Sequence, residues 1–355
     1  MKKIVPEYTF SEEQLNNISV LAKETGLTEQ ITRILYARGV DTAQKINRFM
    51  HPSEKNFLSP FLMRGMKEAV ELITRARDEG WTVAVFGDYD ADGICASAIM
   101  YHALRDFGID AHVYVPERVD GYGLSEEAID RIFEECNPEL FITVDCGISC
   151  AKEAQYIYEL GSDVIVTDHH ELPEVLPDCI VINPKLEDDY PYDNLCGAGV
   201  AFKVACALLG EAAYCYLDFA TLATVADSVP LLGENRDIVT EGLKIFNTKI
   251  RPCFATLIGK AHDVITAQTL AFNVAPRVNA AGRMGDCQAA FRLFISEKET
   301  EIYDLSTKLC MYNTERQKCC DELYTSAKKK LLEKGAYGNV IMLSDESWNT
   351  GFVGI

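Results

Sequence analysis

The sequence lacks long apolar runs, and it lacks an excess of positive charge. No run approaches the roughly 18 apolar residues that a membrane-spanning helix needs, so we expect no membrane association. No apolar segment follows Lys2 and Lys3, and we therefore expect no secretion signal. The net charge is −20, from 34 basic and 54 acidic residues. This balance excludes a broadly basic nucleic-acid-binding surface but leaves room for a local cationic groove.

The cysteine patterns of disulfide scaffolds and zinc fingers are also absent. Thirteen cysteines are an odd number, scattered through apolar segments, which is typical of reduced thiols in a cytosol. Cys146 and Cys150 have the spacing of half a zinc site, but no second Cys/His pair with zinc-finger spacing accompanies them. We therefore expect a cytoplasmic protein without a structural zinc ion.

From Thr82 onward the sequence alternates between short apolar runs and helical patterns. The helical patterns lie at 94–107, 125–136 and 149–160. The apolar runs predict strands at 82–86, 111–115, 140–144, 163–167 and 179–182. This alternation predicts an α/β fold with a parallel sheet flanked by helices on both faces.

The length of 355 residues suits about two domains. Near the start, Ser11 is the expected N-cap of a helix, and Gln14 stands where a capping box requires it. After Ala198 the pattern is mostly helical. We expect a truncated chain in four parts: a helical N-terminal segment (1–70), an α/β domain with a helical extension (71–296), a long connector helix (297–335), and the first strand (339–343) and loop of a second α/β domain (336–355).

Acidic residues follow the first predicted strand. Asp88, Asp90 and Asp92 lie in one loop, and Gly93 allows a tight passage into the next helix. Carboxylates at i and i+2 can reach two neighbouring divalent cations. The competing interpretation is a solvated acidic turn that caps the helix, since aspartate is common at N-caps.

Further potential ligands follow other apolar segments. Asp145 ends the strand at 140–144, His169 and His170 follow the strand at 163–167, and Asp227 follows an apolar helix. The carboxyl ends of parallel strands meet at one edge of a sheet, where ligands of open α/β sheets bind. Carboxylates with neutral imidazoles are typical ligands of Mn²⁺ and Mg²⁺. The alternatives are a helix cap for Asp145, satisfied core or surface histidines, and an ion pair for Asp227.

Six strings in this order resemble the DHH phosphoesterase superfamily, and within it the RecJ-type single-strand-specific exonucleases. They are VFGDYDADG (85–93), VDCGIS (144–149), TDHH (167–170), CGAGVA (196–201), ADSVPL (226–231) and PRVNAAGRM (276–284). The Asp-His-His string alone is weak evidence, but six strings in the family's order make a specific match. The resemblance covers the chain from about Phe57 to its end.

The resemblance implies a site with two Mn²⁺ or Mg²⁺ ions. Asp90 would hold one ion and Asp92 the other, and Asp145 would bridge them. His169 and Asp227 would complete the second site, while His170 would contact the scissile phosphate. Related pyrophosphatase-like proteins carry a histidine at the position of Phe86, and Asp88 is the expected substitute ligand. The candidate catalytic residues are therefore Asp90, Asp92, Asp145, His169, His170 and Asp227, and Asp88 is a candidate metal ligand alone.

Residues outside the acidic cluster are candidates for substrate binding. Arg277, Asn279 and Arg283 lie in a segment rich in Pro, Gly and Ala that we interpret as a turn, and its arginines are expected to clamp phosphate. Paired surface arginines are the alternative. Tyr122 is a candidate for stacking on a base or an ordinary loop residue. The turn at 197–199 can offer N–H groups to an anion or serve close packing.

The resemblance implies a 5′→3′ exonuclease acting on single-stranded DNA in repair and recombination. Two cations roughly 4 Å apart suit in-line hydrolysis of phosphodiesters. The alternatives are a nanoRNase, cyclic-dinucleotide phosphodiesterase or pyrophosphatase of the same superfamily, or a non-catalytic DNA-binding module. Because the family's second cleft domain would begin near Trp348 and its OB-type DNA-binding domain would follow later, we expect the chain to bind metal but to degrade DNA poorly. Protein partners are unknown.

Overall fold

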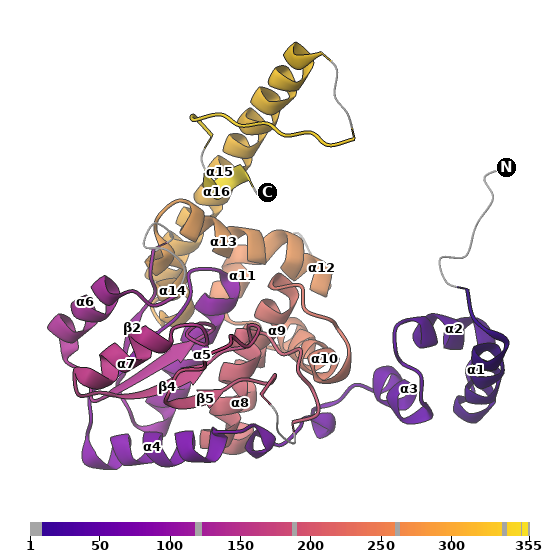
Figure 1. Ribbon diagram of the computed structural model, residues 1–355, viewed down its shortest axis with the longest axis horizontal. Helices are drawn as coiled ribbons and strands as arrows, with labels where there is room; N and C mark the ends of the chain where they lie inside the picture. The colour runs from indigo at the N-terminus through magenta and orange to yellow at the C-terminus, as the bar shows by residue number, and fades with distance from the viewer. Residues whose placement is uncertain are drawn as a thin grey trace.

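A five-stranded parallel sheet lies at the centre of the fold (Figure 1). The computed structural model describes residues 9–117, 123–186, 190–259, 263–335, 339–348 and 350–353. The strand order is β2-β1-β3-β4-β5, with bounds β1 (Val83–Phe86), β2 (His112–Tyr114), β3 (Leu140–Val144), β4 (Asp163–Thr167) and β5 (Ile180–Ile182). The predicted α/β class and all five predicted strands are confirmed, with ends that differ by at most one residue.

Helices cover both faces of this sheet because its side chains are apolar on both sides. Val83 and Val85 pack against one helical layer, while Ala84 and Phe86 pack against the other, as the two-residue period of a strand requires. The first layer contains α4 (Met66–Glu79), α5 (Ala91–Phe107) and α8 (Gly197–Leu209), and the second contains α6 (Glu126–Cys136) and α7 (Ala151–Glu159). The predicted boundary at residue 70 falls inside α4.

The strand order places a crevice at the carboxyl ends of β1 and β3. From β1 the chain crosses to β2 on one side, and then returns to β3 on the other side of β1. The two strands run in register, with Phe86 opposite Thr143. The loops after them therefore separate at a topological switch point, which is where open α/β sheets bind ligands.

A helical extension follows α8 and packs on the first helical layer. Its elements are η4 (Gly210–Tyr216), α9 (Leu217–Ala226), α10 (Gly233–Thr248), α11 (Pro252–Ile258), α12 (Ala267–Thr269), a π-helix η5 (Leu270–Val274), α13 (Ala275–Arg283) and α14 (Cys287–Ile295). By length and composition alone the segment Gly197–Ala226 could cross a membrane, but half of its most apolar window is buried. In the fold α8 and α9 pack against α5 in the core, which accounts for their apolar composition.

The N-terminal helices α1 (Glu12–Thr25), α2 (Glu29–Ala37) and α3 (Ala43–Met50) stand beside this body (Figure 1). The predicted capping box of Ser11 and Gln14 is present. Short 3₁₀ turns η1 (Glu54–Asn56) and η2 (Pro60–Leu62) connect the helices to α4. Asp237 on α10 anchors this connection, because its buried carboxylate accepts hydrogen bonds from Arg48, from the Ser53 N–H and from Asn56.

The predicted long helix is present as α15 (Glu299–Lys334), which projects from the body (Figure 1). It ends at Gly335, the predicted C-cap. The predicted strand at 339–343 is wrong, since these residues pair with no strand in the described part of the chain. The chain instead runs back along α15 to a short helix, α16 (Thr350–Val353), with the Trp348 indole donating to Ser326 Oγ at 3.1 Å.

A buried ion pair between α8 and α10 is expected to stabilise the packing of the helical extension. Lys203 Nζ lies 2.7 Å from Glu234 Oε1, and both side chains are at most 1% exposed. We expect Lys203→Met to lower the free energy of unfolding by about 3–5 kcal/mol, because it leaves a buried carboxylate without its cation. Adding Glu234→Gln should restore part of this loss in urea denaturation, since a neutral amide still accepts from the Leu58 N–H. Equal stability of the Lys203→Met and parent proteins would contradict the pairing.

Candidate metal centre

The loop between β1 and α5 positions the first carboxylates. Asp90 is the N-cap of α5, and its Oδ1 accepts from the N–H groups of Asp92 at 2.8 Å and Gly93 at 3.1 Å. The helix-cap interpretation of this residue is therefore correct. The cap uses one carboxylate oxygen and fixes the direction of the other, so capping and metal binding are compatible.

Asp92 is held by the N-terminus of a second helix. Its carboxylate is buried and accepts from the N–H groups of Gly197 and Ala198, both at 2.7 Å. Both interpretations of the turn at 197–199 hold: Gly197 packs closely against Asp145, and the N–H groups of the turn bind an anion. That anion is the chain's own Asp92, because the first turn of α8 packs directly against α5.

Asp145 follows β3 in a strained conformation. Its φ angle is 60°, in the left-handed region that residues with a side chain rarely adopt. Asp145 Oδ1 is buried and accepts no hydrogen bond among the described residues, although His169 Nε2 lies 3.2 Å away. Asp88 Oδ1 is likewise buried, with no donor in the described part of the chain. Two orphaned carboxylate oxygens in one cavity fit a cation between them.

Asp168 orients the histidine pair that follows it. Its Oδ1 contacts the N–H groups of His169 and His170 and lies 2.7 Å from His170 Nδ1, while its Oδ2 accepts from the Ile148 N–H at 2.9 Å. A partner on Nδ1 fixes the ring and leaves Nε2 of His170 for another contact. The Asp-His-His string alone does not reveal this orienting role of Asp168, which depends on the geometry of the turn.

Asp227 reaches the centre from the C-terminal end of α9. Its Oδ2 lies 3.9 Å from His169 Nε2, which also lies 3.7 Å from Asp92 Oδ2. The loop after it is fixed by Asn235, whose amide donates to the Pro230 carbonyl at 3.1 Å. One imidazole nitrogen facing three carboxylates is the arrangement of a metal site, with His169 as the shared neighbour.

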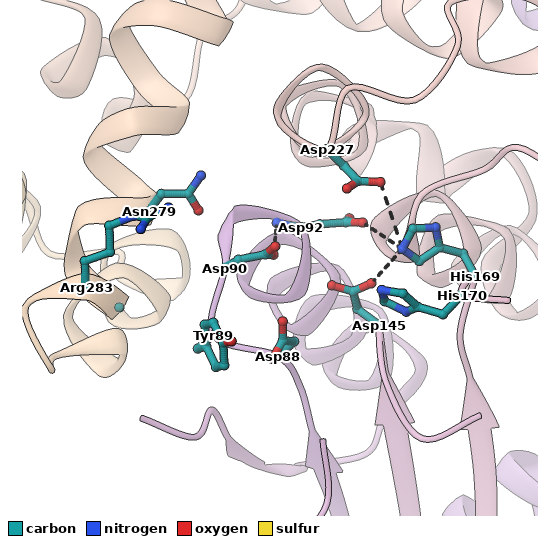
Figure 2. A pocket seen from close by; sticks show the side chains of 11 residues that line it. Asp88, Tyr89, Asp90, Asp92, Asp145, His169, His170, Asp227, Asn279 and Arg283 are labelled. Atoms are coloured by element: carbon teal, nitrogen blue, oxygen red, sulfur yellow. Dashed lines mark hydrogen bonds and ion pairs between the residues drawn. The ribbon is translucent and has the colours of Figure 1, made fainter. Parts of the chain in front are cut away.

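One cavity of about 290 Å³ brings the candidate ligands together (Figure 2); its lining includes Asp88, Asp90, Asp92, Asp145, His169, His170 and Asp227. Its polar side chains fall into groups whose potential ligand atoms all lie within 4.8 Å of one another. The groups are Asp88–Asp90–Asp145, Asp92–His169–Asp227 and Asp145–His169–His170. The first two groups have the composition expected of the two cation sites: Asp88 lies with Asp90 and Asp145, and Asp145 also lies close to His169.

Burial makes this cluster costly without bound cations. It raises the pKa of Asp88 to about 7 and that of Asp227 to about 6, and neighbouring carboxylates act in the same direction. Burial also raises the pKa of Asp145, which is surrounded by other acids. For Asp168 burial is again the largest cause and acts in the same sense, but the charge and hydrogen bonds of His170 and the Ile148 N–H together outweigh it, so the pKa falls. The cluster therefore stores unfavourable charge that divalent cations would neutralise.

Metal affinity should consequently rise with pH between about 5 and 8. Below pH 6 the raised pKa values keep Asp88 and Asp227 protonated, and a protonated carboxyl group must lose its proton to become a ligand. Titration calorimetry with Mn²⁺ in buffers of different ionisation enthalpy should show proton release at pH 6 and little at pH 8. Proton release that is the same at both values would contradict these pKa shifts.

Of the four predicted substrate-binding residues, His170, Asn279 and Arg283 line the cavity and Arg277 does not. The predicted turn in the segment of Arg277, Asn279 and Arg283 is wrong, since the residues form the helix α13. Pro276 does not prevent the helix, because it stands in the first turn, where proline is tolerated. Asn279 and Arg283 point from α13 to the cavity (Figure 2). Arg277 does not line it, since its Nη1 donates to the carbonyls of Leu257 and Asn273. Tyr122 lies outside the described residues.

The fold gives α13 a further role that its sequence did not indicate. Asn279 Oδ1 accepts from the Ala91 N–H at 2.7 Å, which joins α13 to the start of α5. Gly282 packs so closely on this loop that a Cβ atom there would lie 2.9 Å from the Tyr89 carbonyl oxygen. Tyr89 also lines the cavity. These contacts join segments that lie far apart in the sequence, and no local pattern reveals them.

Comparison with known proteins agrees with this geometry. Residues 82–226 match the model of the DHH family, N-terminal domain. The single-stranded-DNA-specific exonuclease RecJ of Bacillus subtilis is 37% identical over 96% of this chain and 44% of its own length. A crystal structure of exonuclease RecJ bound to manganese aligns with a TM-score of 0.75 at 34% identity, over 84% of this chain and 77% of that one. RecJ from Thermus thermophilus in complex with Mn²⁺ aligns with a TM-score of 0.80 at 29% identity, over 96% of this chain and 50% of that one.

The parallel sheet, the aspartate loop at the switch point and the Asp-His-His turn define a member of the DHH superfamily. Within this superfamily, the chain belongs to the RecJ family. It spans about half the length of the curated relatives it matches.

Proposed function

We propose that the chain carries the catalytic centre of a Mn²⁺- or Mg²⁺-dependent exonuclease that hydrolyses phosphodiester bonds of single-stranded DNA. The observation that carries this proposal is the pair of ligand groups, Asp88–Asp90–Asp145 and Asp92–His169–Asp227, in one cavity. Bound divalent cations supply Lewis acidity, which acidifies an attacking water and neutralises charge on phosphate oxygens. The complete ligand sets argue against a non-catalytic DNA-binding module.

The protein side chains around the cations bind and orient the phosphodiester. The hydrogen bond to Asp168 raises the pKa of His170, which favours the protonated ring. Since Nδ1 faces Asp168, the Nε2–H of His170 is the atom that donates to a phosphate oxygen. Arg283, on the opposite wall of the cavity, contributes a second cationic donor. Donors on both sides of the phosphate would stabilise the charge that develops during attack.

The biological setting follows from the relatives and is likewise a proposal. Curated relatives are described as single-stranded-DNA-specific exonucleases, and we propose the same substrate, 5′→3′ polarity and a role in repair and recombination. All thirteen cysteines are free, which supports a reducing cytoplasm. The burial of α8 and α9 supports a protein that does not enter membranes.

Substrate preference tests the proposal against other hydrolases of the superfamily. Rates with Mn²⁺ are compared on single-stranded oligodeoxynucleotides, dinucleotides, cyclic dinucleotides and pyrophosphate. The proposal predicts the highest kcat/KM on the longer single strands, with products released from the 5′ end. A preference for dinucleotides or pyrophosphate by orders of magnitude would overturn it in favour of a nanoRNase-like or pyrophosphatase-like enzyme.

A further inference from the structure

A second hollow adjoins the metal centre. It has a volume of about 300 Å³ and shares Asn279 and Arg283 with the metal-site cavity. Its other walls are mainly apolar and include Phe272 and Pro276, with Arg316 of α15 at its edge. Because Asn279 and Arg283 line both cavities, the second hollow lies next to the place where the cations would hold a phosphate. The volume lies at the small end of ligand sites, which suits one nucleotide and not several.

The backbone around Phe272 is arranged to present its ring to solvent. Phe272 is 73% exposed, whereas Leu270 and Val274 in the same π-helical segment are fully buried. Pro276, four residues later, has no N–H for the Phe272 carbonyl and disfavours a regular α-helix there. Single π-helical turns are frequent at functional sites. An exposed aromatic ring on such a turn, beside a cavity, offers a flat apolar surface to a ligand.

Arg316 brings a second positive charge to the hollow, beside that of Arg283. Its Nε donates to Asn313 Oδ1 at 3.1 Å, and in the described part of the chain no carboxylate lies within ion-pair distance of its guanidinium group. This is notable in a protein with 54 acidic and 34 basic residues. An arginine with no carboxylate partner among the described residues, next to an acidic metal centre, is suited to the phosphate of a bound ligand.

We propose that this hollow is a subsite for the nucleotide that adjoins the scissile phosphate of a single strand. Its base stacks on Phe272, and its phosphate binds Arg316. The proposal rests on the proposed function and deepens it. Stacking on one aromatic ring is tolerant of sequence, because every base has a π-face. The subsite therefore favours single strands, whose bases are free to stack, without selecting among bases.

Binding of a fluorescein-labelled oligodeoxythymidine with phosphorothioate linkages, which resist hydrolysis, tests the subsite by anisotropy in Mn²⁺. Phe272→Ala should raise the Kd roughly tenfold without changing the salt dependence of binding. Phe272→Trp should bind with about the affinity of the parent protein. Arg316→Ala should weaken binding and reduce the slope of log K against log salt by about 0.7, the value for one phosphate contact on a single strand. Both side chains are on the surface or half-buried, so the variants should fold.

Two substitutions on α15, the helix that carries Arg316, are matched controls. Tyr324→Ala removes an aromatic ring that is 67% exposed, and Lys318→Ala removes one exposed positive charge. Neither residue lines the hollow, and neither change should alter affinity or the salt slope. If Phe272→Ala and Arg316→Ala bind like the parent, or if the control variants lose as much affinity, the subsite is refuted.

The failure of the proposed function has a different signature. Bis(p-nitrophenyl) phosphate needs only the metal centre, and the parent protein should hydrolyse it in Mn²⁺. No hydrolysis of this ester would overturn the proposed chemistry. Hydrolysis of the ester together with unchanged oligonucleotide binding by the Phe272 and Arg316 variants would overturn the subsite alone.

Discussion

Asp145→Asn should reduce Mn²⁺-dependent phosphodiester hydrolysis by about 10³-fold, at the upper end of what one charge-stabilising group contributes. Asp145 belongs to two of the three ligand groups, and its Oδ1 is buried with no hydrogen bond in the described part of the chain. Its loss therefore affects both cation sites. The measurement combines hydrolysis of bis(p-nitrophenyl) phosphate with calorimetric titration of Mn²⁺, which should lose at least one of two bound ions.

The same substitution should stabilise the metal-free protein. Burial and neighbouring acids raise the pKa of Asp145, so its charged form opposes folding at neutral pH, and a neutral amide of the same shape removes that cost. We expect a higher Tm for Asp145→Asn without metal and a smaller gain on adding Mn²⁺. The control is Asp163→Asn, because Asp163 begins β4 and so lies at the edge of the sheet opposite to the metal site. A variant with full activity and two bound ions would show that Asp145 is not a shared ligand.

Gly197→Ala should disrupt the centre although residue 197 carries no ligand atom. A Cβ atom at this position would lie 2.2 Å from Asp145 Oδ1 and 2.5 Å from its Cβ. Either the first turn of α8 or the Asp145 carboxylate must move, and the N–H bonds from Gly197 and Ala198 to Asp92 would weaken with it. Because such supporting contacts are typically worth about 10- to 100-fold in metal affinity, we expect a loss of about 100-fold for Mn²⁺.

Gly199→Ala is the matched control for this experiment. It lies two residues later in α8, where a Cβ atom would contact Leu195 at 3.3 Å and could be accommodated by a small shift. Alanine also favours the helix over glycine by up to about 1 kcal/mol. Thermal unfolding and Mn²⁺ titration should therefore leave Gly199→Ala close to the parent. If both variants lost affinity equally, the effect would belong to the helix and not to the contact with Asp145.

The sequence predicts the sheet and the ligand positions for one physical reason. Parallel strands buried on both faces appear as continuous apolar runs, and their carboxyl ends must meet at one edge. The positions of Asp90, Asp145 and His169 at strand ends therefore imply a shared site before any coordinates are known. Local signals were also sufficient for the Ser11 cap and for the connector helix, where few tertiary contacts compete.

Predictions failed where tertiary contacts override composition. The segment around Arg277 is rich in Pro, Gly and Ala, which favours a turn, yet packing on the α5 loop makes it a helix, with Gly282 allowing the close approach to Tyr89. Its Arg277 then bonds to backbone carbonyls instead of lining the site. The apolar run at 339–343 has the composition of a strand, but a strand needs a partner, and none pairs with it in the described part of the chain.

Crystals soaked in Mn²⁺ and measured at its absorption edge test the central claim most directly. We predict two anomalous peaks in the cavity of Figure 2, one among Asp88, Asp90 and Asp145 and the other among Asp92, His169 and Asp227. A single peak elsewhere, or no peak in this cavity at saturating Mn²⁺, would contradict the assignment of these side chains as a two-cation centre.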